Sequence, residues 1–465
     1  MMNKIRNQLA EQQLSLREVV CYGLGMFGGG MGGLGPSMYL SFFWTDIACI
    51  PLGYVSGIML ISRLWDGSDD VLIGWFMGRT KSKYGLARPW ILRMTPVALV
   101  FMLMLFYVPD IGNFGKAAWA FIAYNGYNVF LGTFVMLGLQ SLTSLMTPSP
   151  KGRMTLSLTA QITNAVASIL ASMFLASGLA HFGGGEQGYF YFFGLLSVIG
   201  AALILSAFFG TKEKVRQIEQ NQQKPAFGEA MKSFVKNKWW MIATLYQLLA
   251  FVLQAFGAVS MYYVTSVAGN AAYISPFATV QNLTAFAIPL FLPPLIHKYG
   301  PNNAANLGLV LAAGGCLLPL IDPSSLLLLV LSGALRGIGT AGMFSTRMAV
   351  MADIADYGEY KTGKRTDSLV YSGISLSAKI GMGITGAAIT MILDGAGYVG
   401  GAAVQTPQAL SSITFLFTWV QAICCGAIIL TLLWLKGLEK EMPAVRAELD
   451  RRRALSEKIK SEVNP

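Results

Sequence analysis

Long apolar stretches alternate with short polar segments along the whole chain. A helix needs about 20 apolar residues to cross a hydrocarbon core of about 30 Å. The pattern predicts an all-α membrane protein with twelve transmembrane helices. We expect them at residues 18–44, 51–77, 89–109, 117–146, 155–180, 188–210, 239–267, 273–296, 303–321, 324–352, 368–396 and 409–435.

The polar linkers predict the orientation of these helices. Lys and Arg gather after every second span and after the last one, whereas the opposite loops offer only Lys116. Because basic residues concentrate in cytoplasmic loops, we expect both termini in the cytosol and the protein in an inner or plasma membrane. Residues 1–17 are polar and lack the apolar core of a signal peptide.

The longest internal polar segment, residues 211–238, divides the chain into two similar halves. We therefore expect a six-helix bundle at 1–210, a cytoplasmic linker at 211–238, a second six-helix bundle at 239–436 and a cytoplasmic tail at 437–465. This layout resembles the major facilitator fold, in which the substrate site lies near the midplane between two bundles.

Composition narrows the function classes further. The chain is 54% hydrophobic and only 12% charged, whereas about a quarter of residues are charged in soluble domains. The net charge of +11 comes from loop residues without a basic face carrying aromatics, so no nucleic-acid partner is expected. The five cysteines are scattered in apolar runs and indicate neither disulfides nor a metal site. We expect no cofactor, a monomer in the lipid bilayer and a small-molecule substrate.

Three carboxylates interrupt the second span. Asp66, Asp69 and Asp70 project to one side of a helix, with Arg63 one turn earlier on the same side. Carboxylates one turn apart repel each other by a few kcal/mol at an effective dielectric of ~20. The site must therefore bind a cation, bind a proton or recruit a basic side chain.

The depth of two other polar residues matches that of the acids. Asp66 and Lys379 each lie about 12 residues, or ~18 Å, from the cytoplasmic end of their spans, and Thr133 lies ~19 Å from its own. We predict a Na⁺ or H⁺ site here, with Asp66 and Asp70 as metal ligands if the ion is Na⁺ and Lys379 as counter-ion when no metal is bound. The alternative is a static ion pair that only fixes helix packing, although ionisable groups at this depth are usually functional.

Motifs in both halves carry a family resemblance. The first half contains Tyr22-Gly23-Leu24-Gly25, Arg63-Leu64-Trp65-Asp66 and Arg88-Pro89-Trp90-Ile91-Leu92, and the second contains Asp353-Ile354-Ala355-Asp356-Tyr357-Gly358-Glu359-Tyr360-Lys361. With these motifs nearly the whole chain resembles the glycoside-pentoside-hexuronide:cation symporters. The resemblance implies that Asp66 and Asp70 bind Na⁺, Li⁺ or H⁺, that Thr133 contributes, and that Lys379 links the ion and sugar sites.

The chain departs from the family at the sugar site. The two sugar-binding acids of the family fall on Gly30 and Met136, an aromatic falls on Gln140, and an arginine falls on Gln161. Losing two carboxylates that bind sugar hydroxyls argues against a neutral disaccharide. Gly25, Gly29 and Gly33 have the spacing that lets a helix approach a neighbour or a substrate closely.

Arg347 suggests a different substrate. A pocket without the acids but with a guanidinium favours an anionic sugar, such as a glucuronide, hexuronide or sulfonated sugar, bound bidentately. Alternatively, Arg347 lies only about six residues, or ~9 Å, from the inner end of its span and pairs with Asp353 or Asp356 in a cytoplasmic gate.

Further candidates come from aromatic and charged residues near the helix ends. Tyr262 and Tyr263 match a family aromatic pair and are expected to stack on a sugar ring, with Tyr39 and Trp65 as further candidates; plain interface anchoring is the alternative. Ion pairs that lock the inner mouth are expected from Arg79, Arg88, Arg153, Asp353, Asp356, Glu359 and Arg365. The alternative is that the basic residues only set topology.

These features together predict a secondary active transporter rather than an enzyme. We expect it to couple uptake of a glycoside-like solute to Na⁺ or H⁺ by alternating access. A lysolipid or amphiphile carrier of the same fold and a uniporter remain as alternatives. A membrane-embedded enzyme is disfavoured because the sequence offers no Ser/His/Asp set, His-rich cluster or paired Cys motif at membrane depth.

Overall fold

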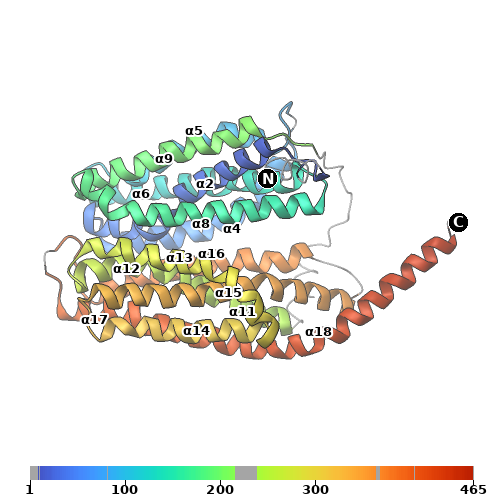
Figure 1. Cartoon of the computed structure of the whole chain (residues 1–465). Coiled ribbons are helices and arrows are strands. Elements are labelled where there is room, and N and C mark those ends of the chain that lie inside the picture. The colour runs from blue at the N-terminus through green and yellow to red at the C-terminus, as the bar shows by residue number, and fades with distance from the viewer. Residues whose placement is uncertain are drawn as a thin grey trace. The chain divides into compact units, whose positions relative to one another are not determined.

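The computed structural model describes residues 9, 11–80, 82–214, 238–362, 367–402 and 404–463. Within the helices, the described side chains exclude those of residues 34–38, 63–72, 74, 75, 78, 150, 290, 292, 293, 295–297, 344, 345, 348, 349, 352, 362, 367–376, 450 and 453–463. Over the described residues the chain forms helices joined by short loops and contains no strand, which confirms the predicted all-α fold (Figure 1).

Helices in the first half follow the six predicted spans. They are α2 (Leu16–Met38) with α3 (Leu40–Phe42) and η1 (Phe43–Ile47), α4 (Leu52–Gly78), α5 (Arg88–Leu105), α6 (Gly112–Tyr127) with η2 (Asn128–Val135) and α7 (Met136–Leu145), α8 (Pro150–His181), and α9 (Gly185–Gly210).

Helices in the second half follow the other six spans. They are α11 (Lys238–Ala255) with η3 (Phe256–Ala258), α12 (Val259–Tyr262) and η4 (Tyr263–Val267), η5 (Ala271–Tyr273) with α13 (Ile274–Tyr299), α14 (Pro301–Leu317) with η6 (Leu318–Leu320), α15 (Leu326–Thr362), α16 (Asp367–Gly395), and α17 (Pro407–Phe415) with η7 (Leu416–Val420) and α18 (Gln421–Val463).

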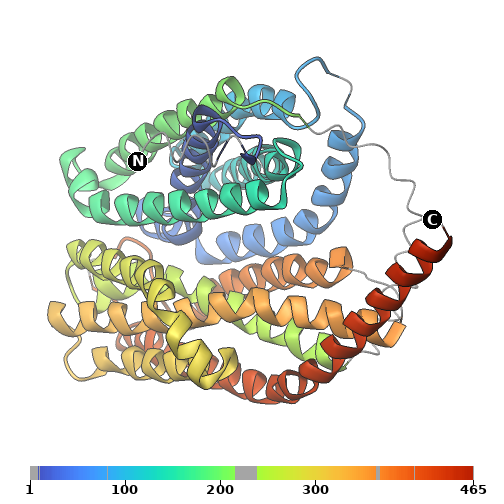
Figure 2. The ribbon, with the colours of Figure 1, turned by 45° about the vertical axis from the view of Figure 1, so that its right-hand side comes forward.

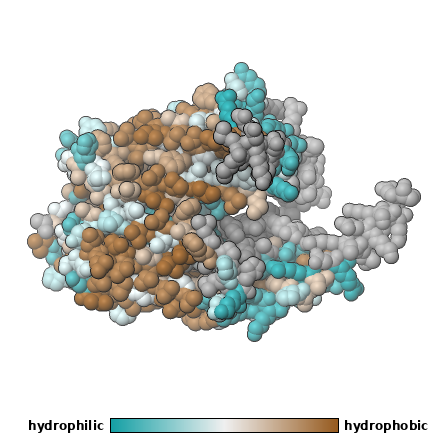
Figure 3. All heavy atoms as spheres, viewed as in Figure 1, coloured by the Kyte–Doolittle hydropathy of each residue, from teal (hydrophilic) through white to brown (hydrophobic). Residues whose placement is uncertain are grey.

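Apolar side chains cover the sides of these helices. Among the described residues, eight helices are long and apolar enough to cross a membrane. Figure 3 shows apolar side chains over the middles of the helices and hydrophilic ones gathered near their ends. A surface of this kind suits burial in hydrocarbon, because lipid tails accept apolar side chains and exclude polar backbone outside helices.

In the described part of the chain, four segments of π-helix interrupt the long helices. They are η1, η2, η4 and η7, and they contain Asp46, Thr133, Tyr263 and Phe417 respectively. A π-turn widens the helix and shifts the side chains that follow it, and such turns occur often at functional sites. Two of these residues, Thr133 and Tyr263, are predicted site residues.

The chain divides into two compact units. The first comprises Met1–Asn221, Gly257–Asn282 and Gly383–Phe415, and the second comprises Gln222–Phe256, Leu283–Met382 and Leu416–Pro465. Segments from the second half of the sequence therefore pack with the first half. The predicted bundles at 1–210 and 239–436 and the tail at 437–465 stay predictions, as does the linker at 211–238, most of which lies outside the described residues.

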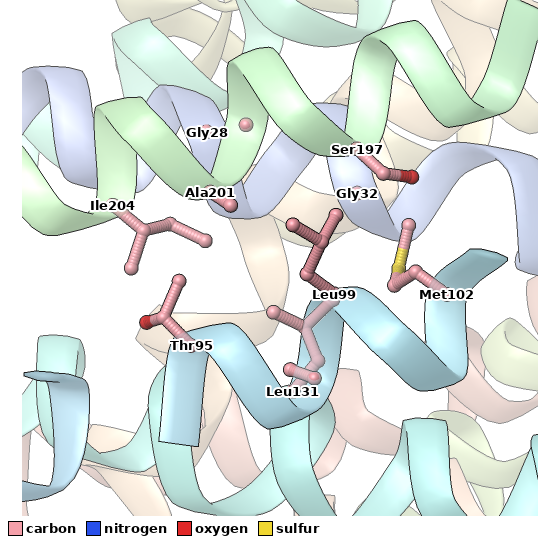
Figure 4. Close-up of a pocket in the computed structure, with 11 residues that line it drawn as sticks. Gly28, Gly32, Thr95, Leu99, Met102, Leu131, Ser197, Ala201 and Ile204 are labelled. Carbon is pink, nitrogen blue, oxygen red and sulfur yellow. The ribbon is translucent and has the colours of Figure 1, made fainter. Parts of the chain in front are cut away.

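Glycines bring α2 against its neighbours in the first unit. A Cβ atom on Gly28 would lie 2.4 Å from the carbonyl oxygen of Gly200 on α9, and one on Gly25 would lie 2.6 Å from the Cβ of Ala207. The two backbones thus meet without side chains between them. A void of about 10 Å³ remains beside this crossing, enough for about one water molecule. Figure 4 shows it between α2, α5 and α9, with Gly28, Gly32, Thr95, Leu131 and Ser197 among its lining residues.

The core of the second unit extends along α18 beyond the membrane span. Leu438, Met442, Val445 and Leu449 are buried at intervals of three or four residues, which places them on one face of the helix. They join a core that includes Ile354 of α15, with Tyr357 packed against it. In both views of the ribbon the last part of α18 runs on past the neighbouring helices (Figures 1 and 2).

Candidate functional site

The three acids of the predicted cation site lie in one continuous helix. Residues Asp66, Asp69 and Asp70 belong to α4, whose backbone is helical from Leu52 to Gly78. Their side chains, and those of Arg63 and Trp65, lie outside the described residues, so the ligand set stays a prediction.

Two other predicted members of the cation site are described. Thr133 is half-buried in η2, where its hydroxyl donates a 3.4 Å hydrogen bond to the carbonyl of Asn128 five residues earlier. Lys379 is half-buried in α16. A partly accessible hydroxyl and ammonium are what a site exchanging ions with water requires, but their assignment to the cation site also stays a prediction.

Met136 of α7 packs against α2 at Gly29, and Asn164 of α8 packs against α2 at Gly30. A Cβ on Gly29 would lie 2.6 Å from the sulfur of Met136, and a Cβ on Gly30 would lie 2.4 Å from the amide oxygen of Asn164. Gln140 and Gln161 are exposed on α7 and α8. Where the family resemblance implies acids, this chain thus places a thioether and a carboxamide against bare backbone.

A hydrogen-bonded cluster joins η1 to two later segments of the first unit. Its members are Thr45, Asp46, Tyr262, Tyr398 and Gly401, which we call the latch cluster. Tyr398 donates from its hydroxyl to Asp46 Oδ1 at 2.5 Å, and the Gly401 N–H donates to the same oxygen at 3.4 Å. The Thr45 hydroxyl donates to Asp46 Oδ2 at 2.6 Å. One carboxylate therefore joins η1 to the loop that follows α16.

Tyr262 completes the latch cluster. Its hydroxyl lies 2.9 Å from that of Thr45; because the Thr45 proton goes to Asp46, Tyr262 must be the donor. The Tyr262 ring is fully buried and packs edge-on against Phe42 and Tyr398, with ring centroids 5.3 and 5.5 Å apart. Tyr263 is also fully buried, and Tyr39 is buried against Phe193. The structure thus places these three predicted sugar-stacking tyrosines in packed surroundings.

A cavity of about 280 Å³ opens beside the latch cluster. Thr45, Cys49, Asp394, Tyr398 and Gly400 are among its lining residues. The latch cluster therefore lies next to an opening at the molecular surface.

Arg347 lies on α15 in the second unit. Its guanidinium carbon lies 5.3 Å from the centre of the Phe251 ring on α11, and the residue is half-buried. A guanidinium over an aromatic face is attracted by the ring quadrupole, and the fork of N–H donors of an arginine matches the oxygens of carboxylate and phosphate groups. This geometry suits recognition of a planar or tetrahedral anion.

The gate acid Asp353 has a partner in α18. Arg446 donates to Asp353 Oδ1 at 2.5 Å. Burial raises the pKa of Asp353 above its usual value, and the hydrogen bond and charge of Arg446 oppose that rise. Asp353 therefore ties α15 to the extension of α18.

The other predicted gate residues are spread over both units. Arg88 donates to the carbonyl of Phe208 at 2.6 Å, and Arg153 donates to that of Thr147 at 3.2 Å. Arg79 is exposed, Asp356 and Glu359 are half-buried, and Arg365 lies outside the described residues. A shared gate therefore stays a prediction.

Comparison with known proteins decides the family. A family model described as MFS/sugar transport protein matches residues 21–437. The chain belongs to this family. Relatives in it include the isoprimeverose transporter of Lactiplantibacillus pentosus, which is 30% identical over 90% of this chain and 88% of its own length.

Two other relatives of this MFS sugar transport chain have names that mention acidic sugars. The glucuronide carrier protein homolog of Escherichia coli is 26% identical over 97% of this chain and 99% of its own length. The putative sulfoquinovose importer of Salmonella typhimurium is 26% identical over 90% of this chain and 89% of its own length. Members of the family are transporters, so the prediction of a transporter rather than an enzyme is confirmed.

Solved structures agree on the fold. The nucleoside transporter NupG superposes with a TM-score of 0.58 at 14% identity, covering 90% of this chain and 98% of that one. The major facilitator superfamily transporter FucP gives 0.52 at 15%, with coverage of 90% and 98%. The predicted major facilitator fold of this sugar transport protein is thereby confirmed.

Several residues with polar contacts in the structure were not among the predicted site residues, and Asp46, Asn164 and Arg336 are examples. Asp46 and Asn164 are described above, and Arg336 is buried in α15, donating to Gln421 Oε1 and the Phe417 carbonyl, both at 2.9 Å. A polar side chain inside an apolar span is the available signal for Asn164 and Arg336. Asp46 has no such signal, because its main partner is 352 residues away.

Proposed function

We propose that this protein imports an anionic sugar or glycoside across an inner membrane, together with Na⁺ or H⁺, by alternating access. Membership of the sugar transport family supports the reaction class. Relatives named as a glucuronide carrier homolog and as a sulfoquinovose importer support the substrate class. The cytosolic termini follow from the predicted topology, and both they and the expected monomeric state belong to this proposal.

The observation that carries the substrate class is the placement of Arg347. The guanidinium lies over Phe251, while Asp353, one of the acids in the gate alternative, is hydrogen-bonded to Arg446. Arg347 thus packs on an aromatic ring, and Asp353 has an arginine partner of its own. Carboxylate and sulfonate groups are the natural ligands of a guanidinium.

Coupling requires both ligands to favour the same conformational change. Cation binding at Asp66 and Asp70 would release Lys379 for the sugar, so each ligand would raise the affinity for the other. In the predicted topology the latch cluster lies at the outer end of the first unit, and its hydrogen bonds must break when the outer side opens. The latch cluster is therefore the proposed outer gate.

The test compares uptake of a labelled glucuronide with uptake of the matched neutral glucoside in membrane vesicles. Losing one charge-assisted contact costs about 1.5–3 kcal/mol, so Arg347→Gln should raise KM for the glucuronide roughly 10- to 100-fold. KM for the glucoside should change less than about twofold by the same reasoning. Arg347→Lys retains the charge and should recover part of the loss.

The control is Arg451→Gln, which removes a largely exposed cation from α18 and should leave both values unchanged. An equal loss for both sugars in Arg347→Gln would contradict anion recognition and favour the gate alternative.

A further inference from the structure

Asn164 lies near mid-membrane depth in the predicted bundle of the first six spans. It is near the centre of α8, which runs from Pro150 to His181. Gly30, its neighbour across the helix interface, is near the centre of the segment formed by α2, α3 and η1. A polar side chain at mid-membrane depth is costly unless it has a function or a partner.

The carboxamide of Asn164 has no hydrogen-bonding protein partner among the described residues. Its backbone carbonyl accepts from the Ser168 hydroxyl at 3.1 Å, whereas the side chain is half-buried and its amide oxygen lies over Gly30, 2.4 Å from where a Cβ would stand. A carboxamide offers two donors and an acceptor. These groups are available to a ligand.

The face of α8 that carries Asn164 can be identified from its neighbours. Ser168 and Ser172 follow at four-residue steps, so the three side chains lie in one row. Asn282 donates to the Ser172 hydroxyl at 2.9 Å, and the Ala176 N–H lies 2.8 Å from the Ser275 hydroxyl. The part of α8 at Ser172 and Ala176 therefore contacts a segment from the second half of the sequence, whereas Asn164 lies against Gly30 of α2.

We propose that Asn164 binds a hydroxyl group of the transported sugar and sets its charge preference. The proposal rests on the proposed function. A neutral carboxamide can hold a sugar hydroxyl as donor and acceptor, and unlike a carboxylate it does not repel an anionic sugar. Gly30 is required for this contact, because any side chain at position 30 would displace the carboxamide of Asn164.

The test uses one substitution that removes the carboxamide and one that replaces it with a negative charge. Asn164→Ala removes the contact and should raise KM about 5- to 10-fold for both the glucuronide and the glucoside. Asn164→Asp restores an acceptor but adds a charge, so it should raise KM at least ~10-fold for the glucuronide alone. The difference between the two sugars in Asn164→Asp is an effect that a purely structural role would not produce.

Two glycines on α2 provide a matched pair. Gly30→Ala pushes the carboxamide aside and should weaken uptake of both sugars in the same way as Asn164→Ala. At Gly33 the nearest atom to a Cβ is the Tyr127 hydroxyl at 4.0 Å, so Gly33→Ala should leave uptake unchanged. Equal behaviour of Gly30→Ala and Gly33→Ala would count against the proposal.

The remaining measurements keep the outcomes separate. Sugar binding to purified variants, measured calorimetrically in detergent, tests the contact even where transport is lost, and a melting curve checks that each variant is folded. Wild-type protein that imports neither sugar refutes the proposed function itself. Active wild type with unchanged KM in both Asn164 variants refutes only the role of Asn164.

Discussion

At the scale of single residues, Asp46 is the centre of the latch cluster. Its two carboxylate oxygens accept from Tyr398, Gly401 and Thr45, and Thr45 is in turn bonded to Tyr262. Hydrogen bonds to a charged acceptor contribute about 1.5–3 kcal/mol each. The latch cluster is therefore stable in this conformation, and removing one donor should loosen it measurably.

Tyr398→Phe tests this strength, because it removes the hydroxyl and keeps the ring packing. The reporter is Ser41→Cys in a Cys49→Ser background; Ser41 is buried one turn inward of Thr45. Losing about 1.5 kcal/mol of the free energy that favours the closed latch cluster should raise the rate of labelling by an impermeant maleimide roughly tenfold. Tyr107→Phe, at an exposed tyrosine outside the cluster, should leave the rate unchanged, and an unchanged rate in Tyr398→Phe would refute the gate.

Residue chemistry also marks the limit of prediction from sequence. The carboxylates of α4 and the apolar spans were predictable because each forms a local pattern of charge or hydrophobicity. The latch cluster was not, because Asp46 and Tyr398 are joined only by the fold. A role for Asn164 was not predictable either, because a single amide in an apolar span forms no repeating pattern. Its contact depends on Gly30, which only the fold brings opposite it.

At the scale of helices, a carboxylate from a distant segment holds the start of α5. Glu213 accepts from the backbone N–H groups of Leu86, Ala87 and Arg88 at 2.7, 2.9 and 3.0 Å. It thus binds the free donors at the start of α5 and complements the positive end of the helix dipole. Gly85 has φ +109°, and a Cβ there would meet the Glu213 carboxylate, so the glycine is required.

Glu213→Ala should therefore lower stability. A carboxylate cap contributes about 1–2 kcal/mol, since its removal leaves helix donors unsatisfied and the dipole uncompensated. Thermal unfolding in detergent should show a lower Tm than wild type. Glu186→Ala, at an exposed acid in the first turn of α9, is the matched control; an equal Tm for both variants would argue against the cap.

The pairing of α18 with α15 predicts a pH effect. Burial raises the pKa of Asp353 and Arg446 opposes it, so Arg446→Ala should raise that pKa further. When burial raises the pKa of a carboxyl, the folding stability falls as the pH rises through that pKa, because the folded protein must then bury an unpaired charge. The variant should be destabilised more at pH 8 than at pH 5, by about 1 kcal/mol or less since Arg446 is largely exposed.

Melting curves at three pH values measure this effect. Adding Asp353→Asn to Arg446→Ala should remove the extra loss at pH 8, because the side chain at position 353 no longer titrates. A pH-independent difference between Arg446→Ala and wild type would show that the ion pair does not link the two helices.

At the scale of the whole molecule, the sequence predicted the architecture and the class of function. Hydropathy located the spans, and the motifs located the family, because both are repeated or contiguous signals. The π-helical segments were not predicted: a single extra residue in a turn leaves the apolar pattern intact, yet it changes which way Asp46 and Thr133 point. The coupling ion also stays undetermined, since carboxylates and hydroxyls suit both Na⁺ and H⁺.

Ion coupling is testable by measuring uptake between pH 5.5 and 8 with and without a Na⁺ gradient. Asp70→Asn should abolish stimulation by the coupling ion while residual downhill uptake persists, because it removes one predicted ligand charge. Asp69→Asn, at the one acid of the three that the family resemblance does not assign to the ion, should retain stimulation. A wild type that ignores both gradients would be a uniporter.

The crossing of α2 and α9 restricts how this sequence can drift. A Cβ on Gly28 meets the carbonyl of Gly200 at 2.4 Å, and a Cβ on Gly200 meets that of Gly28 at 2.9 Å. Each obstacle is main chain, so no change of side chain at the other position can make room. In a saturation library selected for growth on the transported sugar, these two codons should stay fixed, whereas Gly57, with open space around it, should diversify.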